Sequence, residues 1–255
     1  MSPRDIRQNM KNNSNPRYTG FIDILGFKSA VYETAQNPEI YTRIITALTN
    51  LSSIEELLKK IRPADADAKD EEYVNAFIGL KVQVFSDCIL ISSKANNLGF
   101  TALTACCALS FWMLFSNGFF GRGAITKGEL IHNDSIIFGK SLIQAYELEQ
   151  KPAIYPRIIL AKEINEEESV LTKKIPTKID FDGTTFLNVF YPDTKRIITE
   201  WNNKHSAENH IDLHKGRLAL IEALHKDNDL SVHQKLVWLK NYLNEESENL
   251  GLDKI

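Results

Sequence analysis

Apolar and polar residues alternate along the chain in patterns that predict strands and helices in turn. Residues 18–25 combine aromatic and β-branched side chains, as buried strands do, and Gly26 ends this strand. A helical pattern follows from about residue 29. Over residues 40–61 the apolar positions recur every three or four residues, which predicts a long amphipathic helix that ends before a proline.

The next segments continue this alternation. Two apolar runs, residues 77–85 and 88–93, flank Ser86-Asp87, a signal for a short hairpin with Asp87 at its tip. The order β-α-β-β-α-β-β-α-β indicates an α+β fold with a ferredoxin-like core and additions. The other elements expected in this core are a buried helix at 98–115, a strand pair at 119–127 and 130–138 around Gly128-Glu129, a helix at 139–149 and a strand at 153–161.

Three parts of the chain differ in composition. Residues 1–17 are polar and rich in Asn, so we expect a flexible N-terminal arm. Residues 18–200 form the main domain, and residues 201–255 form a C-terminal helical extension. The later elements expected are an acidic helix at 162–171, a strand at 185–190 and helices at 208–225 and 232–244.

Charge and cysteine content narrow the classes of function. The formal net charge of -3 gives no global basic field, so we expect no nucleic-acid partner, and a small anionic ligand fits better. Three cysteines form neither a disulfide framework nor a C-x-x-C metal site, which favours a reducing compartment. Residues 1–17 contain no apolar leader, and the apolar stretch 98–120 is interrupted by polar residues. We therefore expect a cytoplasmic protein without a membrane span.

Two acidic residues are the main candidates for chemistry. Asp23 lies within an apolar strand, where an unpaired carboxylate costs several kcal/mol unless a cation or hydrogen-bond donors compensate it. A ferredoxin-like sheet places Asp87 beside the end of that strand. Taken singly, Asp87 is an ordinary turn residue and Asp23 a carboxylate bonded to backbone amides. Taken together they predict a site for hard cations, completed by the main-chain carbonyl of Ile24.

Four segments carry a resemblance to a known family. They are FIDILGFK (residues 21–28), KVQVFSDCILIS (81–92), GRGAITKGEL (121–130) and FGKSLIQAYELEQ (138–150). In order and spacing they resemble the successive blocks of the class III nucleotidyl cyclase domain, over residues 18 to about 161. Within that superfamily, the sequences of these segments are most similar to those of the pyrimidine (uridylate) cyclases of the bacterial Pycsar antiphage systems.

The resemblance implies an activity and its partners. Asp23, Ile24 and Asp87 would hold two divalent cations, Mg²⁺ or Mn²⁺, over a nucleoside triphosphate. The enzyme would convert UTP to 3′,5′-cyclic UMP and pyrophosphate, as a homodimer with composite active sites. The product would signal to a cyclic-nucleotide-binding effector in antiphage defence. Gly26 and Phe27, which begin three residues after Asp23, are further candidates for substrate binding, because a glycine lets a phosphate approach the backbone.

The residues that read the base in the family depart here from the purine enzymes. The position four residues before the second metal Asp holds Gln83, not the Lys or Glu of purine cyclases. A second base-reading position holds Ile136, which offers a base no hydrogen bond. A purine base would therefore be poorly recognised. Gln83 does not discriminate between uracil and cytosine, because its amide can both donate and accept hydrogen bonds.

The transition-state residues of the family are also replaced. Ile143 and Glu147 stand where purine cyclases carry an Asn and an Arg. Arg122 and Arg157 are the candidates for the missing catalytic cation. Two alternatives stay open: a cyclase for CTP or a purine nucleotide, and a catalytically degenerate domain that binds a nucleotide for regulation.

Overall fold

The computed structural model describes residues 16–60, 79–167, 175–226 and 229–255. The expected N-terminal arm lies outside these ranges except for Pro16 and Arg17, which begin the first strand. Residues 77–78 of an expected strand and residues 168–171 of the expected acidic helix lie outside them too.

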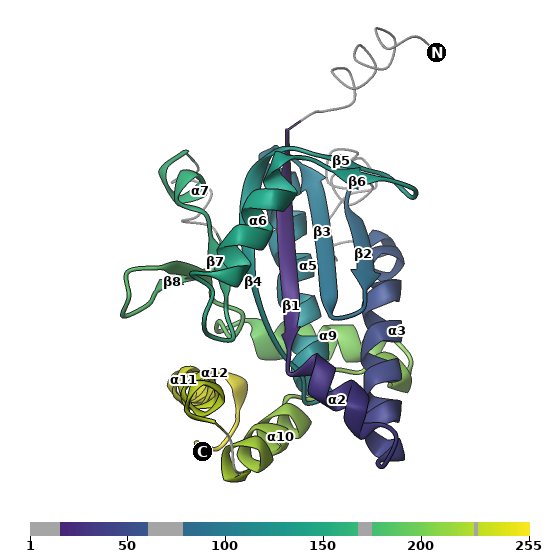
Figure 1. Ribbon diagram of the computed structural model, residues 1–255, viewed down its shortest axis with the longest axis vertical. Helices are drawn as coiled ribbons and strands as arrows, with labels where there is room; N and C mark the ends of the chain where they lie inside the picture. The colour runs from purple at the N-terminus through teal and green to yellow at the C-terminus, as the bar shows by residue number, and fades with distance from the viewer. Residues whose placement is uncertain (1–15, 61–78, 168–174, 227–228) are drawn as a thin grey trace, which may run out of the picture.

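A seven-stranded mixed sheet forms the centre of the molecule (Figure 1). Neighbouring strands are antiparallel except for β4 and β7, which pair in parallel. A second sheet pairs two short strands, β5 (Ile131–His132) and β6 (Ile137–Phe138). The chain is therefore an α+β protein, as expected. In spatial order the large sheet consists of β2 (Lys81–Phe85), β3 (Cys88–Lys94), β1 (Pro16–Leu25), β4 (Phe120–Glu129), β7 (Ile158–Leu160), β9 (Thr185–Leu187) and β8 (Thr177–Ile179).

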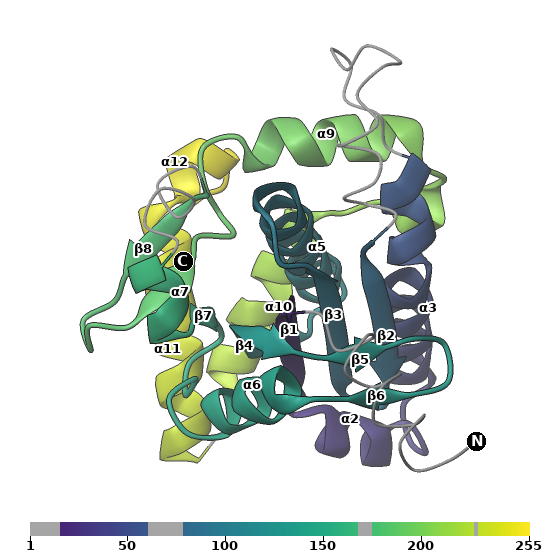
Figure 2. The ribbon, with the colours of Figure 1, turned by 90° about the horizontal axis from the view of Figure 1, so that it is seen from above.

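Helices cover both faces of the sheet (Figure 2). On one face lie α3 (Pro38–Lys60) and α5 (Asn97–Ser116), and on the other lies α6 (Lys140–Gln150). Alternate residues of β1 show the division, because Tyr18 contacts Phe100 of α5 whereas Thr19 hydrogen-bonds Ser141 of α6. The short helix α2 (Phe27–Glu33) connects β1 to α3.

Helix α5 is the central helix of the core. It is apolar around its whole circumference, and nearly all of its side chains are buried. By length and composition alone it could cross a membrane, because an 18-residue stretch of it has a mean hydropathy of 1.8, but 83% of that stretch is buried within the fold. Core helices of soluble proteins are buried to this extent, so the structure is consistent with a soluble protein.

The C-terminal helices pack on the same core. After α7 (Lys162–Glu167) and the β8–β9 hairpin, the chain forms α9 (Thr194–Lys204), which spans the expected domain boundary at residue 200. The apolar side chains of α10 (Leu213–His225) and α11 (Leu230–Glu245) join the core cluster that surrounds α5. The remaining elements are η1 (Ala207–Asn209) and α12 (Ser247–Leu250).

The structure corrects two expected strands. Residues 130–138 do not form a strand paired with β4; their two ends pair with each other, because the side chain of Asn133 accepts hydrogen bonds from the main chain of Ser135 and Ile136 and makes a tight turn. The strand expected at 153–161 is reduced to β7, because residues 152–157 form turns around two prolines.

Other corrections concern the C-terminal half. The helix expected from residue 208 begins at Leu213, because the Asp212 side chain caps the main-chain amides of His214 and Lys215. The short strand β8 and the amphipathic helix α9 were not expected from the sequence. The expected helices around α3, α5, α6 and α11 are confirmed within a few residues.

Candidate functional site

Asp23 lies near the carboxyl end of β1, on the face of the sheet that α6 covers. It shares this face with Thr19 and Phe21, which contact α6. Its neighbours across the sheet are Cys88 on β3 and Arg122 on β4. The side chain is half-buried, so it is partly accessible at the open end of this face.

Asp87 occupies the second position of the two-residue turn between β2 and β3, as the sequence predicted. Ser86, the first position, has a left-handed φ of 54°, which suits a tight hairpin turn. The carbonyl of Asp87 accepts a hydrogen bond of 2.9 Å from the main-chain amide of Ile24. This bond fixes the turn against the end of β1 and brings the two acids together.

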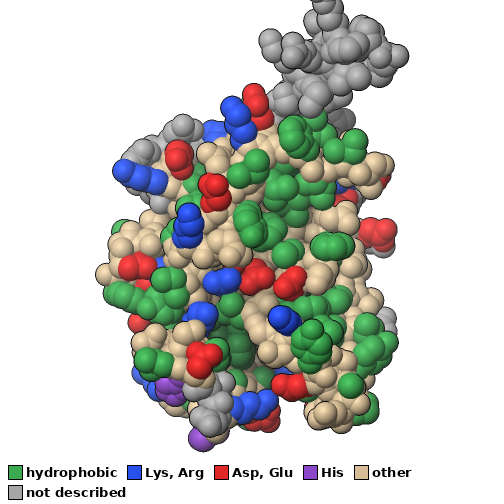
Figure 3. All heavy atoms as spheres, viewed as in Figure 1, with side chains coloured by type: hydrophobic (Ala, Val, Ile, Leu, Met, Phe, Trp, Pro, Cys, Tyr) green, Lys and Arg blue, Asp and Glu red, His purple; other side chains and the backbone are tan. Residues whose placement is uncertain are grey.

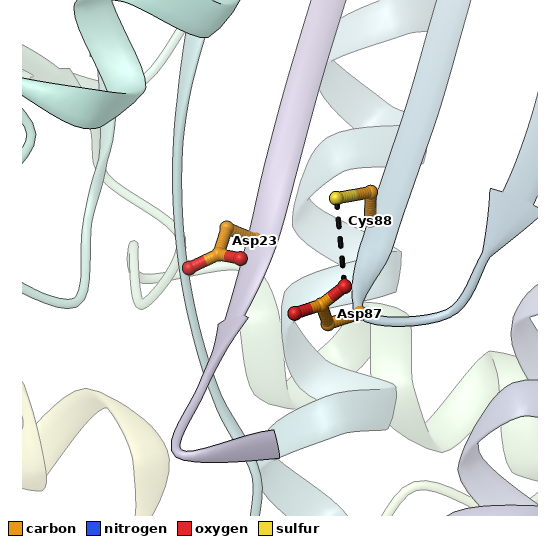
Figure 4. A group of neighbouring side chains, drawn as sticks. All are labelled: Asp23, Asp87 and Cys88. Carbon is orange, nitrogen blue, oxygen red and sulfur yellow. Dashed lines mark hydrogen bonds between the residues drawn. The ribbon is translucent and has the colours of Figure 1, made fainter. Parts of the chain in front are cut away.

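The carboxylates of Asp23 and Asp87 and the thiol of Cys88 form one cluster (Figure 4), with one potential ligand atom of each within 4.8 Å of the others. The Cys88 Sγ lies 3.8 Å from Asp87 Oδ1. Burial, together with the nearby carboxylates, raises the pKa of Cys88 to about 12. The thiol is therefore protonated at neutral pH, and the available ligands are carboxylate oxygens, which suit hard cations.

Burial also raises the pKa of Asp23, and the charge of Asp87 acts in the same direction. The charges of Arg122 and Lys235 oppose this rise. Two carboxylates this close disfavour each other's ionised form, and a bound cation would relieve that repulsion. The arrangement therefore fits a divalent cation.

Arg122 connects the acid cluster to the interior. Its Nε lies 3.3 Å from Asp23 Oδ2, and its Nη2 lies 2.6 Å from Glu149 Oε1. The Glu149 side chain is fully buried, and burial raises its pKa although the charge of Arg122 opposes this. Glu149 was not among the residues predicted for the site. The sequence does indicate its buried position, because Ser141, Ala145 and Glu149 recur every four residues and so lie on the same, buried face of α6.

The base-reading candidates lie on the same side of the sheet as the acids. Gln83 of β2 pairs with Leu90 of β3, and its side chain is exposed. Leu90 belongs to a small cluster with Phe21 and with Ala145 of α6, so this register position faces α6. Ile136 lies in the turn between β5 and β6 and is 56% exposed.

Gly26 and Phe27 follow β1 directly. Gly26 adopts a left-handed φ of 73°, and no atom lies within 4 Å of the position a β-carbon would occupy. Its main chain is therefore open to a ligand. The side chain of Phe27 is buried in the core, so only its backbone could contact a substrate.

Arg157 is engaged away from the acid cluster. Its guanidinium is buried and forms ion pairs with Asp180 and Asp182 in the loop between β8 and β9. It also lies over the rings of Tyr155 and Trp238. These contacts satisfy its charge within the fold. Of the two arginines expected at the site, the structure brings Arg122 to the acids and places Arg157 in this separate ion-pair cluster.

Comparisons with known proteins do not assign this chain to a family: no family model matches it, and no characterised protein matches its sequence.

Proposed function

We propose that this protein is a pyrimidine nucleotide cyclase that converts UTP to 3′,5′-cyclic UMP and pyrophosphate. The observation that carries the proposal is the convergence of Asp23 and Asp87, one from a strand and one from a hairpin turn, on a single point at the end of the sheet. Paired acids of this kind are the protein ligands that two-metal phosphoryl-transfer sites need.

The strand order supports a ferredoxin-like core. The first four strands along the chain lie in the order β2-β3-β1-β4 and are antiparallel. The connecting helices α3 and α5 lie on one face. This is the order and layering of a β-α-β-β-α-β unit. The four sequence blocks that resemble class III cyclases all fall within this unit and the adjoining helix α6.

Two divalent cations fit the acid cluster. The carboxylates of Asp23 and Asp87 and the carbonyl of Ile24 would hold them. When bound, the cations would acidify the ribose 3′-hydroxyl and neutralise charge on the triphosphate. A site with few protein ligands suits Mg²⁺ or Mn²⁺, because substrate phosphates supply the rest.

The proposed reaction is an intramolecular displacement. The 3′-oxygen forms a bond to the α-phosphorus, the bond from that phosphorus to the diphosphate breaks, and the hydroxyl proton is released to water. The chain's own residues would act by positioning. The open main chain at Gly26 would admit a phosphate, and Arg122, whose Nε lies 3.3 Å from Asp23 Oδ2, would supply positive charge.

Base selection would depend on Gln83. Its exposed amide can donate to one uracil carbonyl or accept from the ring N–H. Ile136 offers an apolar contact and no hydrogen bond. Neither residue is matched to the edge of a purine.

A homodimer with composite sites forms part of the proposal. Apolar side chains gather on the face around α6 and the β5–β6 hairpin (Figure 3). Exposed apolar surface of this kind marks interaction sites. Ile143 and Glu147 lie on the outer side of α6, where they would face a partner. The large exposed side chains on this face are Phe85, Ile136, Phe138, Ile143 and Tyr146.

The cellular role rests on the resemblance alone. Like the pyrimidine cyclases of antiphage systems, the protein would act in the cytoplasm, and its product would activate a cyclic-nucleotide-binding effector.

A second candidate function has its own supporting observation. Arg122 is already paired with Asp23 and Glu149, and Ile143 and Glu147 supply no transition-state group. A nucleotide-binding regulatory domain would show these features while keeping the acids. It would bind Mn²⁺ and UTP without forming a product.

The experiment compares turnover of UTP with Mn²⁺ in the wild-type protein, in Asp23→Asn and in Asp87→Asn, with Asp193→Asn as the control. Asp193 is an exposed acid at the start of α9. Loss of cyclic UMP in the two site variants, with the fold retained by circular dichroism, supports the proposal. Equal product formation in Asp87→Asn and Asp193→Asn would refute the site.

A further inference from the structure

Arg122 contacts two carboxylates that differ in their access to solvent. Its Nε lies 3.3 Å from Asp23 Oδ2, and its Nη2 lies 2.6 Å from Glu149 Oε1. The side chain of Asp23 is 19% exposed, whereas that of Glu149 is completely buried. A cation that arrives from solvent can therefore reach Asp23 but not Glu149. Only one of the two contacts of Arg122 is open to competition.

Glu149 is held rigidly in the interior. It lies on the buried face of α6, one turn after Ala145, and α6 packs on both β1 and β4. Its second oxygen, Oε2, accepts a hydrogen bond of 2.8 Å from Nε2 of Gln150. Each carboxylate oxygen of Glu149 therefore has a contact of its own. The carboxylate is a fixed anchor for the guanidinium of Arg122.

The main chain of Arg122 is fixed as well. Arg122 is paired with Asp23 across β4 and β1, and the next residue, Gly123, is paired with Ile158 of β7. The strand therefore has a neighbour on each side at this point. Arg122 can change its contacts only through its side chain, and Glu149 holds the far end of that side chain.

A cation at the acid cluster and Arg122 would compete for the same carboxylate. In Figure 4 one oxygen of Asp23 faces Asp87 and the other faces away from it. Arg122 contacts Oδ2 of Asp23, and a bound cation would oppose that contact by its charge. An arginine with no other partner would then lose its only ion pair. Arg122 keeps its ion pair with Glu149 and stays beside the site.

We propose that Glu149 is a positioning residue. It would hold Arg122 back from a full ion pair with Asp23, so that Asp23 stays open to divalent cations and Arg122 stays directed at the phosphates that these cations bind. This rests on the proposed function, because the cations must bind at Asp23 and Asp87. Glu149 would touch neither cation nor substrate and would act only through Arg122. Without the charge of Glu149, Arg122 would pair with Asp23 alone and neutralise a metal ligand.

The test measures Mn²⁺ binding to the full chain without nucleotide, from the electron paramagnetic resonance signal of the free ion. The variants are Glu149→Gln, Arg122→Gln and the double variant. Glu163→Gln is the control, because Glu163 is an exposed acid on α7, which also packs against β4. We expect Glu149→Gln to raise the Kd for Mn²⁺ by about threefold to tenfold. Arg122→Gln should lower this Kd, because it removes the competitor.

The double variant tests whether Glu149 acts through Arg122. We expect it to bind Mn²⁺ as tightly as Arg122→Gln does. Effects of the two substitutions on the free energy of Mn²⁺ binding that simply add would refute the positioning role, because Glu149 would then act on the cation directly. Each titration is made below the melting temperature of the variant, so that only folded protein is compared.

The outcomes separate this inference from the proposed function. If the wild-type protein binds Mn²⁺ and Glu149→Gln has the Kd of Glu163→Gln, the positioning role is refuted and the cyclase proposal stands. A lower melting temperature alone would then assign Glu149 to stability. If the wild-type protein binds no Mn²⁺, both proposals fail. If the Mn²⁺ affinities change as expected but no nucleotide is cyclised, the positioning of Arg122 is supported and the cyclase reaction is refuted.

Discussion

Arg122 and Asp23 are directly opposite each other on β4 and β1, and the guanidinium Nε lies 3.3 Å from the carboxylate. The negative charge of Asp23 is therefore balanced by the protein itself. The second contact of Arg122, at 2.6 Å from the buried Glu149, shares that positive charge between a surface acid and an interior one. A cation that binds Asp23 competes with Arg122, and Glu149 holds the arginine in place.

Removing the charge of Glu149 should destabilise the fold. Glu149→Gln leaves the partly buried Arg122 with one partner, so we expect a loss of about 2–4 kcal/mol in the free energy of unfolding. Urea denaturation of Glu149→Gln and of Glu147→Gln, an exposed position on the same helix, measures the difference. Equal unfolding midpoints for the two variants would contradict the role given to Glu149.

The sequence pattern predicted the secondary-structure elements better than the contacts between distant parts of the chain. The turn at Ser86-Asp87 and the strand that carries Asp23 follow from turn residues and apolar runs, so both acids were identified. The partner of Arg122 is set by the packing of α6 on β4, a contact between distant parts of the chain. Arg157 was assigned to the site from its apolar strand, but that position is buried by Trp238, Tyr155 and Phe186. A local pattern can place a charged residue on a buried face, as for Glu149, but it does not show which distant residue will pair with it.

The ion-pair cluster of Arg157 should be structural. Arg157→Ala leaves Asp180 and Asp182 without their cation, and we expect a loss of about 3–5 kcal/mol in unfolding free energy. Although burial opposes it, hydrogen bonds from Arg157 and Thr184 lower the pKa of Asp182 to about 2. The variant should therefore lose stability at neutral pH, measured by urea unfolding. A fully stable Arg157→Ala protein with reduced turnover would instead place this arginine in the active site.

Changing Gln83 should alter base preference more than stability. The side chain is exposed, so Gln83→Glu should leave the melting temperature close to that of the wild type. The ratio of kcat/KM values for UTP and CTP should change by about tenfold, because a carboxylate accepts hydrogen bonds and donates none. Gln36→Glu, at an exposed loop residue, is the control. An unchanged ratio would remove Gln83 from the base pocket.

Stability should fall in mild acid because of His132. Burial and the charge of Arg17 lower the pKa of His132 to about 4, and its Nδ1 lies 2.8 Å from Ser92 Oγ. The unfolded chain, with a pKa near 6.5, binds a proton more readily, so folding stability decreases as pH falls from about 6.5 to about 4. His132→Asn should flatten this part of the profile of urea midpoint against pH, whereas the exposed His233→Asn should not. Parallel profiles for both variants would contradict the assignment.

The most direct test of the account is to incubate the purified protein with ATP, GTP, CTP and UTP separately, with Mn²⁺ or Mg²⁺, and to identify the products by mass spectrometry. We predict 3′,5′-cyclic UMP and pyrophosphate from UTP, and little or no cyclic product from the purine nucleotides. Formation of no cyclic nucleotide from any of the four, by a protein that is folded and binds Mn²⁺, would contradict the proposed activity.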